Sequence, residues 1–157
     1  MDCRHVQFRD RPDCLDLPQL QALFNRCAFW AQDRSLEDLA TALRHSNPVV
    51  SVWDGDRLIG FARATSDGIY RAMIWDVVVD EAYRGAGLGR KLVETILAHP
   101  QVQRVERVYL MTTHQQAFYE RIGFETNQST TLVFYNAAAE LLVTPEAQPA
   151  VGSTVAA

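Results

Sequence analysis

The sequence predicts an α/β domain of the α+β kind, in which helices pack on a mixed β-sheet. Three observations lead to this prediction. The 157 residues are 48% hydrophobic and 22% charged, which is typical of one globular domain. Segments whose apolar residues recur at helical spacing alternate with segments rich in β-branched residues. The apolar run at 73–79 is nearly continuous, as expected of a central strand buried on both faces.

The first half of the chain predicts a strand, two helices and a β-hairpin. The expected strands are at 5–9, 49–53 and 57–65, and the expected helices are at 17–29 and from 36 onward. Asp16 and Ser35 stand where a side chain can cap the first turn of each helix. Asn47-Pro48 stops the second helix. The tight turn Asp54-Gly55-Asp56 joins the last two strands into a hairpin.

The second half predicts two more helices and four more strands. The expected strands are at 73–79, at 107–111, from Phe124 onward and at 131–135, and the expected helices are at 88–98 and 115–122. His99-Pro100 ends the first of these helices, and Gly123 closes the second. Residues 144–157 contain prolines and many alanines without periodicity, which predicts a disordered tail. The folded domain is therefore expected at residues 5–140.

Charge, hydropathy and cysteine spacing argue against several classes of protein. The formal net charge is −4, whereas nucleic-acid-binding domains usually carry a basic patch. The chain has no run of the roughly 18 apolar residues that a membrane span needs, and its first ten residues lack the apolar core of a secretory signal. Cys3, Cys14 and Cys27 form no metal-binding spacing. We therefore expect a cytoplasmic protein with reduced thiols, no metal, and no nucleic-acid or membrane partner.

Three glycines occupy alternate positions between the strand at 73–79 and the next helix. Gly85, Gly87 and Gly89 let a ligand approach the backbone, and the start of a helix favours an anion. Arg84 and Arg90 add positive charge beside them. The segment does not match a dinucleotide-binding fingerprint, because the sixth position counted from Gly85 is Arg90 where that motif needs glycine. It does not match a P-loop, because the Gly-Lys-Ser/Thr sequence is missing. A tight turn without a ligand is the alternative.

Two sequence blocks resemble the GNAT (GCN5-related N-acetyltransferase) superfamily. Arg84-x-x-Gly87-x-Gly89 resembles its acetyl-CoA pyrophosphate loop, in which Gln or Arg is followed at the same spacing by Gly and by Gly or Ala. Ala117-Phe118-Tyr119-Glu120-x-x-Gly123-Phe124 resembles a second block of the same superfamily, at the expected separation. The order of the expected elements also matches, so the resemblance covers roughly residues 5–135.

The segments 62–67 (ARATSD) and 74–79 (IWDVVV) are similar to a cyanobacterial and plastid group of GNAT enzymes related to serotonin (arylalkylamine) N-acetyltransferases. The superfamily resemblance implies a mixed, mostly antiparallel central sheet of about six to seven strands with a V-shaped splay, flanked by about four helices. It also implies acetyl-CoA as co-substrate. Acetyl-CoA would lie in a cleft between the strands at 73–79 and 107–111.

The resemblance further implies which residues bind acetyl-CoA. Backbone groups of Val77, Val78 and Val79 would pair with the pantetheine arm and face the thioester carbonyl. The loop and the helix start would hold the pyrophosphate through Arg84, Gly85, Ala86, Gly87, Leu88, Gly89 and Arg90. Tyr119 matches the tyrosine of the second block and would also contact acetyl-CoA.

The implied reaction is direct attack of an amine on the acetyl-CoA thioester within a ternary complex. The amine must first lose a proton, because an alkylamine has a pKa of about 10. The departing thiolate must gain one. Tyr119 is the candidate general acid, since a phenol is protonated at neutral pH. The alternative is that Tyr119 only packs on a short helix.

Two residues are candidates for the general base. Asp76 interrupts an apolar strand, where an unpaired carboxylate is costly. It would bind the amine, relay a proton through water, or make a structural hydrogen bond at a strand bulge. His114 follows the strand at 107–111, and histidine is a common general base, although a lone surface histidine is usually inert. The sequence leaves these roles open.

Phe29 and Trp30 are candidates for the acceptor site, because an aromatic wall suits an arylalkylamine; the alternative places both in the core. The predicted function is transfer of an acetyl group from acetyl-CoA to a primary amine such as serotonin or tryptamine. The alternatives are a protein lysine or N-terminal acetyltransferase, and a non-catalytic acyl-CoA-binding regulatory module. The expected partners are a small-molecule amine or a protein amine, and a second copy of the chain in a homodimer.

Overall fold

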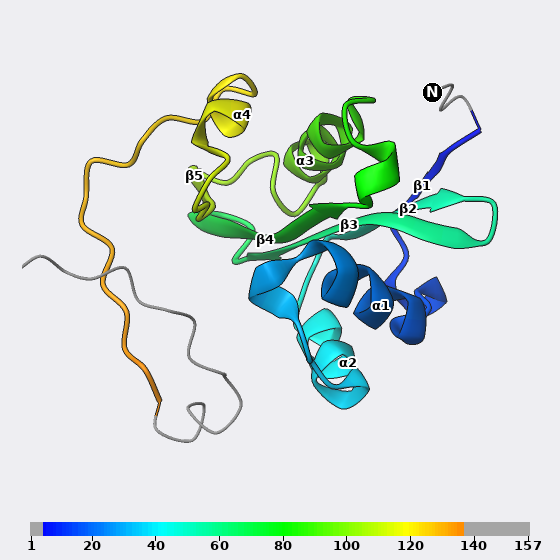
Figure 1. Ribbon diagram of the computed structural model, residues 1–157. Coiled ribbons are helices and arrows are strands. Elements are labelled where there is room, and N and C mark those ends of the chain that lie inside the picture. Colours follow the sequence, from blue (N-terminus) through cyan, green and yellow to red (C-terminus); the bar gives the residue numbers. More distant parts are fainter. Residues whose placement is uncertain (1–4, 137–157) are drawn as a thin grey trace, which may run out of the picture. The chain divides into compact units, whose positions relative to one another are not determined.

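The structure, a computed structural model, describes residues 5–136 (Figure 1). The chain divides into two units, Met1–Phe124 and Glu125–Ala157, and every helix and strand of the described residues lies in the first. The first unit has helices on both faces of a mixed sheet, so the predicted fold class is confirmed. The predicted domain end at 140 and the predicted tail at 144–157 lie outside the described residues.

The sheet of the first unit has five strands in the order β1-β2-β3-β4-β5. Neighbouring strands pair antiparallel from β1 to β4, whereas β5 pairs parallel with β4. The strands are Gln7–Arg9 (β1), Val49–Asp54 (β2), Arg57–Ser66 (β3), Arg71–Val79 (β4) and Arg107–Tyr109 (β5). The predicted hairpin is therefore present as β2 and β3, and Gly55 in its turn has a φ of 58°.

The two strands predicted from Phe124 onward are not formed within the described residues, so this part of the prediction was wrong. Residues 132–135 are apolar, but their side chains are between 70% and 88% exposed. A strand becomes stable when it pairs with a neighbour and buries one face. These residues do neither, and the sheet has five strands instead of the expected six to seven.

Four α-helices flank the sheet: Leu17–Cys27 (α1), Leu36–Arg44 (α2), Leu88–Ala98 (α3) and Gln116–Glu120 (α4). Three 3-10 turns are Pro12–Cys14 (η1), Phe29–Ala31 (η2) and Glu81–Tyr83 (η3). The side chains of Asp16 and Ser35 accept hydrogen bonds from the backbone N–H groups of Gln19 and Asp38, which confirms both predicted helix caps. Helices α1 and α2 cover one face of the sheet, and α3 and α4 lie on the other (Figure 1).

Each face of the sheet has its own apolar core. On the α1 side, Leu20, Leu23 and Phe24 are buried, and the Phe24 ring packs edge-on against Phe61 of β3. On the α3 side, the helix buries a stripe of apolar residues against β2, β3 and β4, namely Leu88, Leu92, Val93 and Ile96. Apolar residues at helical spacing therefore hold α1 and α3 on opposite sides of the central strands.

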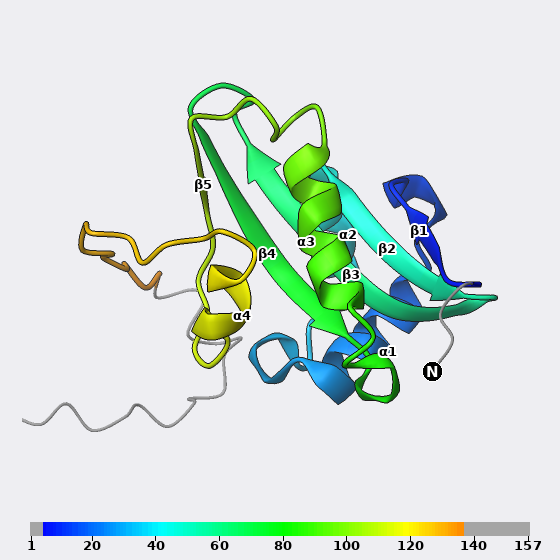
Figure 2. The same ribbon diagram turned by 90° about the horizontal axis from the view of Figure 1, so that it is seen from above.

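Strands β4 and β5 separate part-way along their length. They pair only where Arg71–Met73 faces Arg107–Tyr109, whereas β3 continues to pair with β4 as far as Val79. Figure 2 shows β5 diverging from β4 toward α4. The V-shaped splay that the resemblance implied is confirmed, and it leaves one backbone edge of β4 without a neighbouring strand.

Candidate active site

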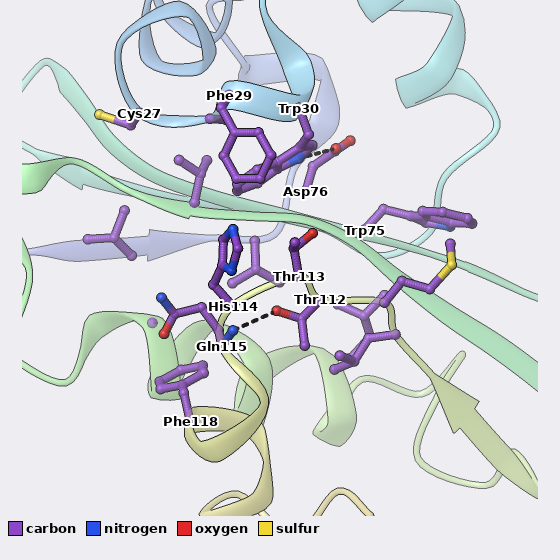
Figure 3. A pocket seen from close by; sticks show the side chains of 18 of the residues that line it. Cys27, Phe29, Trp30, Trp75, Asp76, Thr112, Thr113, His114, Gln115 and Phe118 are labelled. Carbon is purple, nitrogen blue, oxygen red and sulfur yellow. Dashed lines mark hydrogen bonds between the residues drawn. The ribbon is translucent and has the colours of Figure 1, made fainter. Parts of the chain in front are cut away.

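A cavity of about 940 Å³ lies where β4 and β5 separate (Figure 3). This volume is within the range of small-molecule and cofactor sites. Its walls come from the end of β4, the η2 segment after α1, and the loop and helix after β5. The predicted site residues that line it are Phe29, Trp30, Asp76, Val77, Val78, Val79, Arg84, Gly89, His114 and Tyr119. The geometry therefore brings together residues from four separate parts of the sequence.

Strand β4 is interrupted by a bulge within the cavity wall. Phe61 pairs with Val78 and Arg63 pairs with Trp75, so two residues of β4 oppose one residue of β3. Asp76 lies in this bulge with a φ of 55°. A residue other than glycine pays a conformational cost there, of order 1–3 kcal/mol, although aspartate tolerates it better than most. Interactions of the side chain therefore have to hold this conformation.

Those interactions are three hydrogen bonds to the Asp76 carboxylate, whose side chain is 5% exposed. Oδ2 accepts from Arg63 Nε at 2.8 Å and from Arg34 Nη1 at 3.1 Å. Oδ1 accepts from the indole Nε1 of Trp30 at 3.3 Å, as the dashed line in Figure 3 marks. The carboxylate is buried and ion-paired, which removes the cost that an unpaired charge would have.

The η2 segment forms an aromatic wall on one side of the cavity. Phe29 and Trp30 are 50% and 43% exposed, and their rings pack edge-to-face at 5.1 Å between centroids. The His114 ring stands 6.2 Å from the Phe29 ring on the opposite wall (Figure 3). The alternative that placed Phe29 and Trp30 in the core was wrong, because the buried residue of η2 is Ala31.

The glycine loop leads directly into α3. Gly87 is the N-cap of α3, and Gly85 and Gly87 have φ values of 80° and 81°. A Cβ atom added to either glycine would meet no atom within 4 Å, so the space beside this backbone is open. The first hydrogen bond of the helix runs from Lys91 N–H to the Gly87 carbonyl, which leaves the amides before Lys91 available to an anion.

The two predicted phosphate-binding arginines lie in different places. Arg84 lines the cavity, and its Nε donates to the Val79 carbonyl at 3.3 Å. Arg90 pairs with Glu94 along α3 at 2.7 Å and is not part of the cavity wall. Only Arg84 therefore reaches the site. A Cβ at Gly89 would stand 3.4 Å from the Phe118 ring, at ordinary contact distance, so Gly89 lies against α4.

Tyr119 projects from α4 into the cavity wall. Its ring packs edge-on against Phe118 and Phe124, at centroid distances of 4.9 and 5.9 Å. Burial raises the pKa of the Tyr119 phenol above its ordinary value, because the phenolate would lose hydration. The phenol therefore keeps its proton at neutral and mildly alkaline pH.

Comparison with known proteins identifies the fold family. Residues 17–124 match the acetyltransferase (GNAT) family. A soybean (Glycine max) protein named histone acetyltransferase TAP1 is 37% identical over 125 residues, covering 72% of this chain and 53% of its own length. A rice (Oryza sativa subsp. japonica) protein named serotonin N-acetyltransferase 2, chloroplastic, is 36% identical over 118 residues, covering 70% and 56%. The chain belongs to the GNAT family.

Solved structures agree with this assignment. The crystal structure of a GNAT-family protein from Xanthomonas campestris, described as a putative acetyltransferase, superposes with a TM-score of 0.71 at 26% identity, over 96% of this chain and 98% of that one. The chain spans about half the length of the soybean and rice relatives. Within residues 5–136, no helix is long and apolar enough to cross a membrane, and no group of three His, Cys, Asp or Glu residues could hold a metal ion.

GNAT acetyltransferases use acetyl-CoA as co-substrate, and the residues of this chain fit it. The free edge of β4 can pair with an amide-containing pantetheine arm as an added strand would. The open space beside Gly85 and Gly87, the free amides of α3 and the Arg84 guanidinium suit a pyrophosphate. Of the predicted acetyl-CoA-binding residues, Val77, Val78, Val79, Arg84, Gly89 and Tyr119 line the cavity, whereas Gly85, Ala86, Gly87, Leu88 and Arg90 do not.

Sequence reasoning missed two arginines of this GNAT site. Arg34 and Arg63 line the cavity and pair with Asp76, although they lie 42 and 13 residues from it in the chain. The position of Arg63 opposite Trp75 follows from the pairing of β3 and β4, so strand register could have found it. Nothing in the spacing of Arg34 points to this contact.

Proposed function

We propose that this GNAT domain transfers the acetyl group of acetyl-CoA to the primary amine of a small molecule that carries an aromatic ring, such as serotonin or tryptamine. The observation that carries the proposal is the half-exposed pair Phe29 and Trp30 at the cavity wall. Large aromatic side chains are usually buried, and an exposed pair inside a cavity favours a planar apolar ligand. The name of the rice relative, serotonin N-acetyltransferase 2, supports the same class of acceptor.

The donor end of the cavity comprises the β4 edge after the bulge and the glycine loop. Bound acetyl-CoA would supply a thioester activated toward amines. Backbone groups of Val77–Val79 would orient it, and an N–H of this stretch would stabilise negative charge on the carbonyl oxygen. The loop Arg84–Gly89 would hold the pyrophosphate through backbone amides and the Arg84 side chain.

Tyr119 and His114 would move the protons. The C–N bond forms as the C–S bond breaks, the amine loses a proton, and the thiolate gains one. We assign the general acid to Tyr119, whose phenol is protonated at neutral pH and whose pKa burial raises further. His114 is exposed, faces the aromatic wall and would pass the amine proton to solvent.

A protein amine is the second candidate acceptor. The soybean relative named histone acetyltransferase TAP1 supports it, because it is 37% identical to this chain and the rice relative is 36% identical. A peptide acceptor would need to enter beside Phe29 and His114, whose ring centroids are 6.2 Å apart. The predicted cytoplasmic location and homodimer stay predictions.

A thiol-release assay with acetyl-CoA tests the proposal. The panel would contain tryptamine, serotonin, an aliphatic amine of similar size and a lysine-containing histone peptide. We expect kcat/KM for the aromatic amines to exceed that for the aliphatic amine by about tenfold, as one well-packed aromatic contact allows. Preference for the peptide would favour the second candidate. CoA binding without thiol release for any acceptor would favour a non-catalytic module.

A further inference from the structure

We infer that Asp76 is a positioning residue: it fastens the aromatic wall of the acceptor end to the bulge of β4 and does not act as the general base. The inference rests on the proposed function for the identity of the acceptor. It replaces the catalytic role that the sequence allowed for Asp76 with a role in acceptor specificity.

Both oxygens of the Asp76 carboxylate already accept hydrogen bonds from neighbouring side chains. Oδ2 accepts two guanidinium hydrogen bonds, from Arg63 and Arg34, and Oδ1 accepts the indole N–H of Trp30. Both oxygens therefore have partners, and two of the partners are positively charged. A base needs an oxygen that can take a proton from the amine. Protonating this carboxylate would break an ion pair that is almost completely buried.

Asp76 also connects the segment 28–35 to the sheet. Trp30 and Arg34 both belong to this segment, which joins α1 to α2. Other hydrogen bonds of the segment run to α1, for example from the Asp33 N–H to Asn25 Oδ1 at 2.9 Å. Among the described residues, the hydrogen bonds between this segment and the sheet, from Trp30 and Arg34, both end on the Asp76 carboxylate. Asp76 is thus the polar link between the aromatic wall and β4.

The bulge of β4 directs the Asp76 side chain toward the aromatic wall. The left-handed conformation at Asp76 interrupts the alternation of β4. Figure 3 shows the Asp76 carboxylate pointing at Trp30 on the upper wall, away from His114 and Thr113 on the lower one. The strained residue therefore contacts the wall that we assign to acceptor binding. A strained residue held by three hydrogen bonds, two from this wall and one from Arg63 of β3, is typical of a preorganised site.

The substitution Asp76→Asn tests this role with little backbone disturbance, because asparagine also tolerates the left-handed region. It keeps one acceptor oxygen but removes the charge. We expect KM for tryptamine to rise by about 3- to 10-fold, the value of one hydrogen bond, with kcat and KM for acetyl-CoA changing less than about twofold. The acidic limb of the pH–kcat profile should stay where it is in the wild type. A general base would instead give a loss of kcat of about 100-fold or more and the disappearance of that limb.

Trp30→Phe provides a second variant, which keeps an aromatic side chain but replaces the indole with a smaller phenyl ring and so removes the indole N–H. It should raise KM for tryptamine in the same direction, and its effect should not add to that of Asp76→Asn. The matched control is Glu106→Gln, which removes an ion-paired carboxylate outside the cavity. An unchanged KM for tryptamine in Trp30→Phe would overturn the inference. This test remains possible if Asp76→Asn fails to fold.

Hydrogen exchange separates this inference from the proposed function, because it needs no acceptor. Amides of residues 28–35 should exchange about tenfold faster in Asp76→Asn than in the wild type, whereas those of α3 should not change. Equal exchange in segment 28–35 would overturn the positioning role even if the enzyme acetylates aromatic amines. Faster exchange in an enzyme that rejects aromatic amines would leave the positioning role intact and contradict only the proposed acceptor.

Discussion

Two aspartates, four residues apart at the end of β4, hold the two ends of the cavity in similar ways. Asp76 and Asp80 each accept hydrogen bonds from two arginines, and their side chains are 5% and 4% exposed. Asp76 lines the cavity at the acceptor end. Asp80 lies outside the cavity wall, where it caps η3 just before the glycine loop through the Ala82 N–H.

The partners of the two carboxylates explain their different tasks. Asp80 binds Arg26 of α1 and Arg57 of β3 at 2.7 and 2.8 Å, so it joins three elements of the rigid core. Burial alone raises the pKa of Asp80, but the Ala82 amide and the two guanidinium groups outweigh it and hold that pKa below its usual value. Asp76 also binds β3, through Arg63, but its other two partners, Arg34 and Trp30, belong to a connecting segment. The same arrangement of charges therefore anchors the proposed acetyl-CoA loop in one case and the proposed acceptor wall in the other.

The largest expected effect lies between the two ends, at Tyr119. Tyr119→Phe should lower kcat by about 100-fold with both KM values within about twofold, because the variant loses the proton donor but keeps the ring. Since burial raises the pKa of Tyr119, the wild-type kcat should stay high through the ordinary tyrosine range and decline only above it. Steady-state kinetics from pH 6 upward would measure both. The control Tyr70→Phe changes an exposed phenol outside the cavity. Unchanged turnover in Tyr119→Phe would exclude Tyr119 as the general acid.

The donor end can be broken at the glycine loop. Gly87→Ala places a Cβ at a φ of 81°, and the strain of about 1–2 kcal/mol should raise KM for acetyl-CoA by about tenfold while KM for the amine stays unchanged. Gly55→Ala is a matched control, because Gly55 also has a positive φ and open space beside it but lies in the β2–β3 turn. Equal effects of the two variants on acetyl-CoA would contradict the phosphate-loop assignment.

Asp80→Asn tests the anchor of the donor end through stability. Two charged hydrogen bonds weaken, but Arg26 and Arg57 are about half exposed, so we expect a loss of only about 1–2 kcal/mol in the free energy of unfolding. Because the folded pKa of Asp80 is lowered, its contribution is present above the unfolded pKa of about 3.9 and disappears as the pH falls. Urea titrations at pH 7 and in mild acid should show that the variant has lost part of this acid dependence. An identical acid dependence would exclude Asp80 as its source.

The smallest effects should distinguish the two loop arginines. Arg84→Gln removes a guanidinium group from the cavity wall, so KM for acetyl-CoA should rise by about threefold. Arg90→Gln removes a solvent-exposed pair with Glu94, which is worth little, so the change should stay below about twofold. Competition with desulfo-CoA in the same assay would compare the two. A larger effect of Arg90→Gln would show that the α3 surface contacts the phosphates.

Sequence reasoning predicted most of the fold because its signals are local. Helical spacing of apolar residues located α1 and α3, cap residues placed the starts of α1 and α2, and the turn at Gly55 located the hairpin. It failed after Phe124, where the sequence predicts strands from Phe124 onward and at 131–135 that the described residues do not form. Local composition gives a strand propensity, but only a neighbouring edge at the right distance makes a strand stable.

The sequence by itself determined the family blocks, the glycine loop and the identity of the acidic, phenolic and aromatic candidates, because these depend on residue type and spacing. Only the tertiary structure decided what they contact. Phe29 and Trp30 lie at a cavity wall and not in the core, and Arg90 pairs with Glu94. The Asp76 carboxylate binds Arg34 and Arg63, which come from two different parts of the chain. The physical reason is that ion pairs and burial depend on strand register and on the path of connecting segments, and residues up to 46 positions apart meet at Asp76 for this reason.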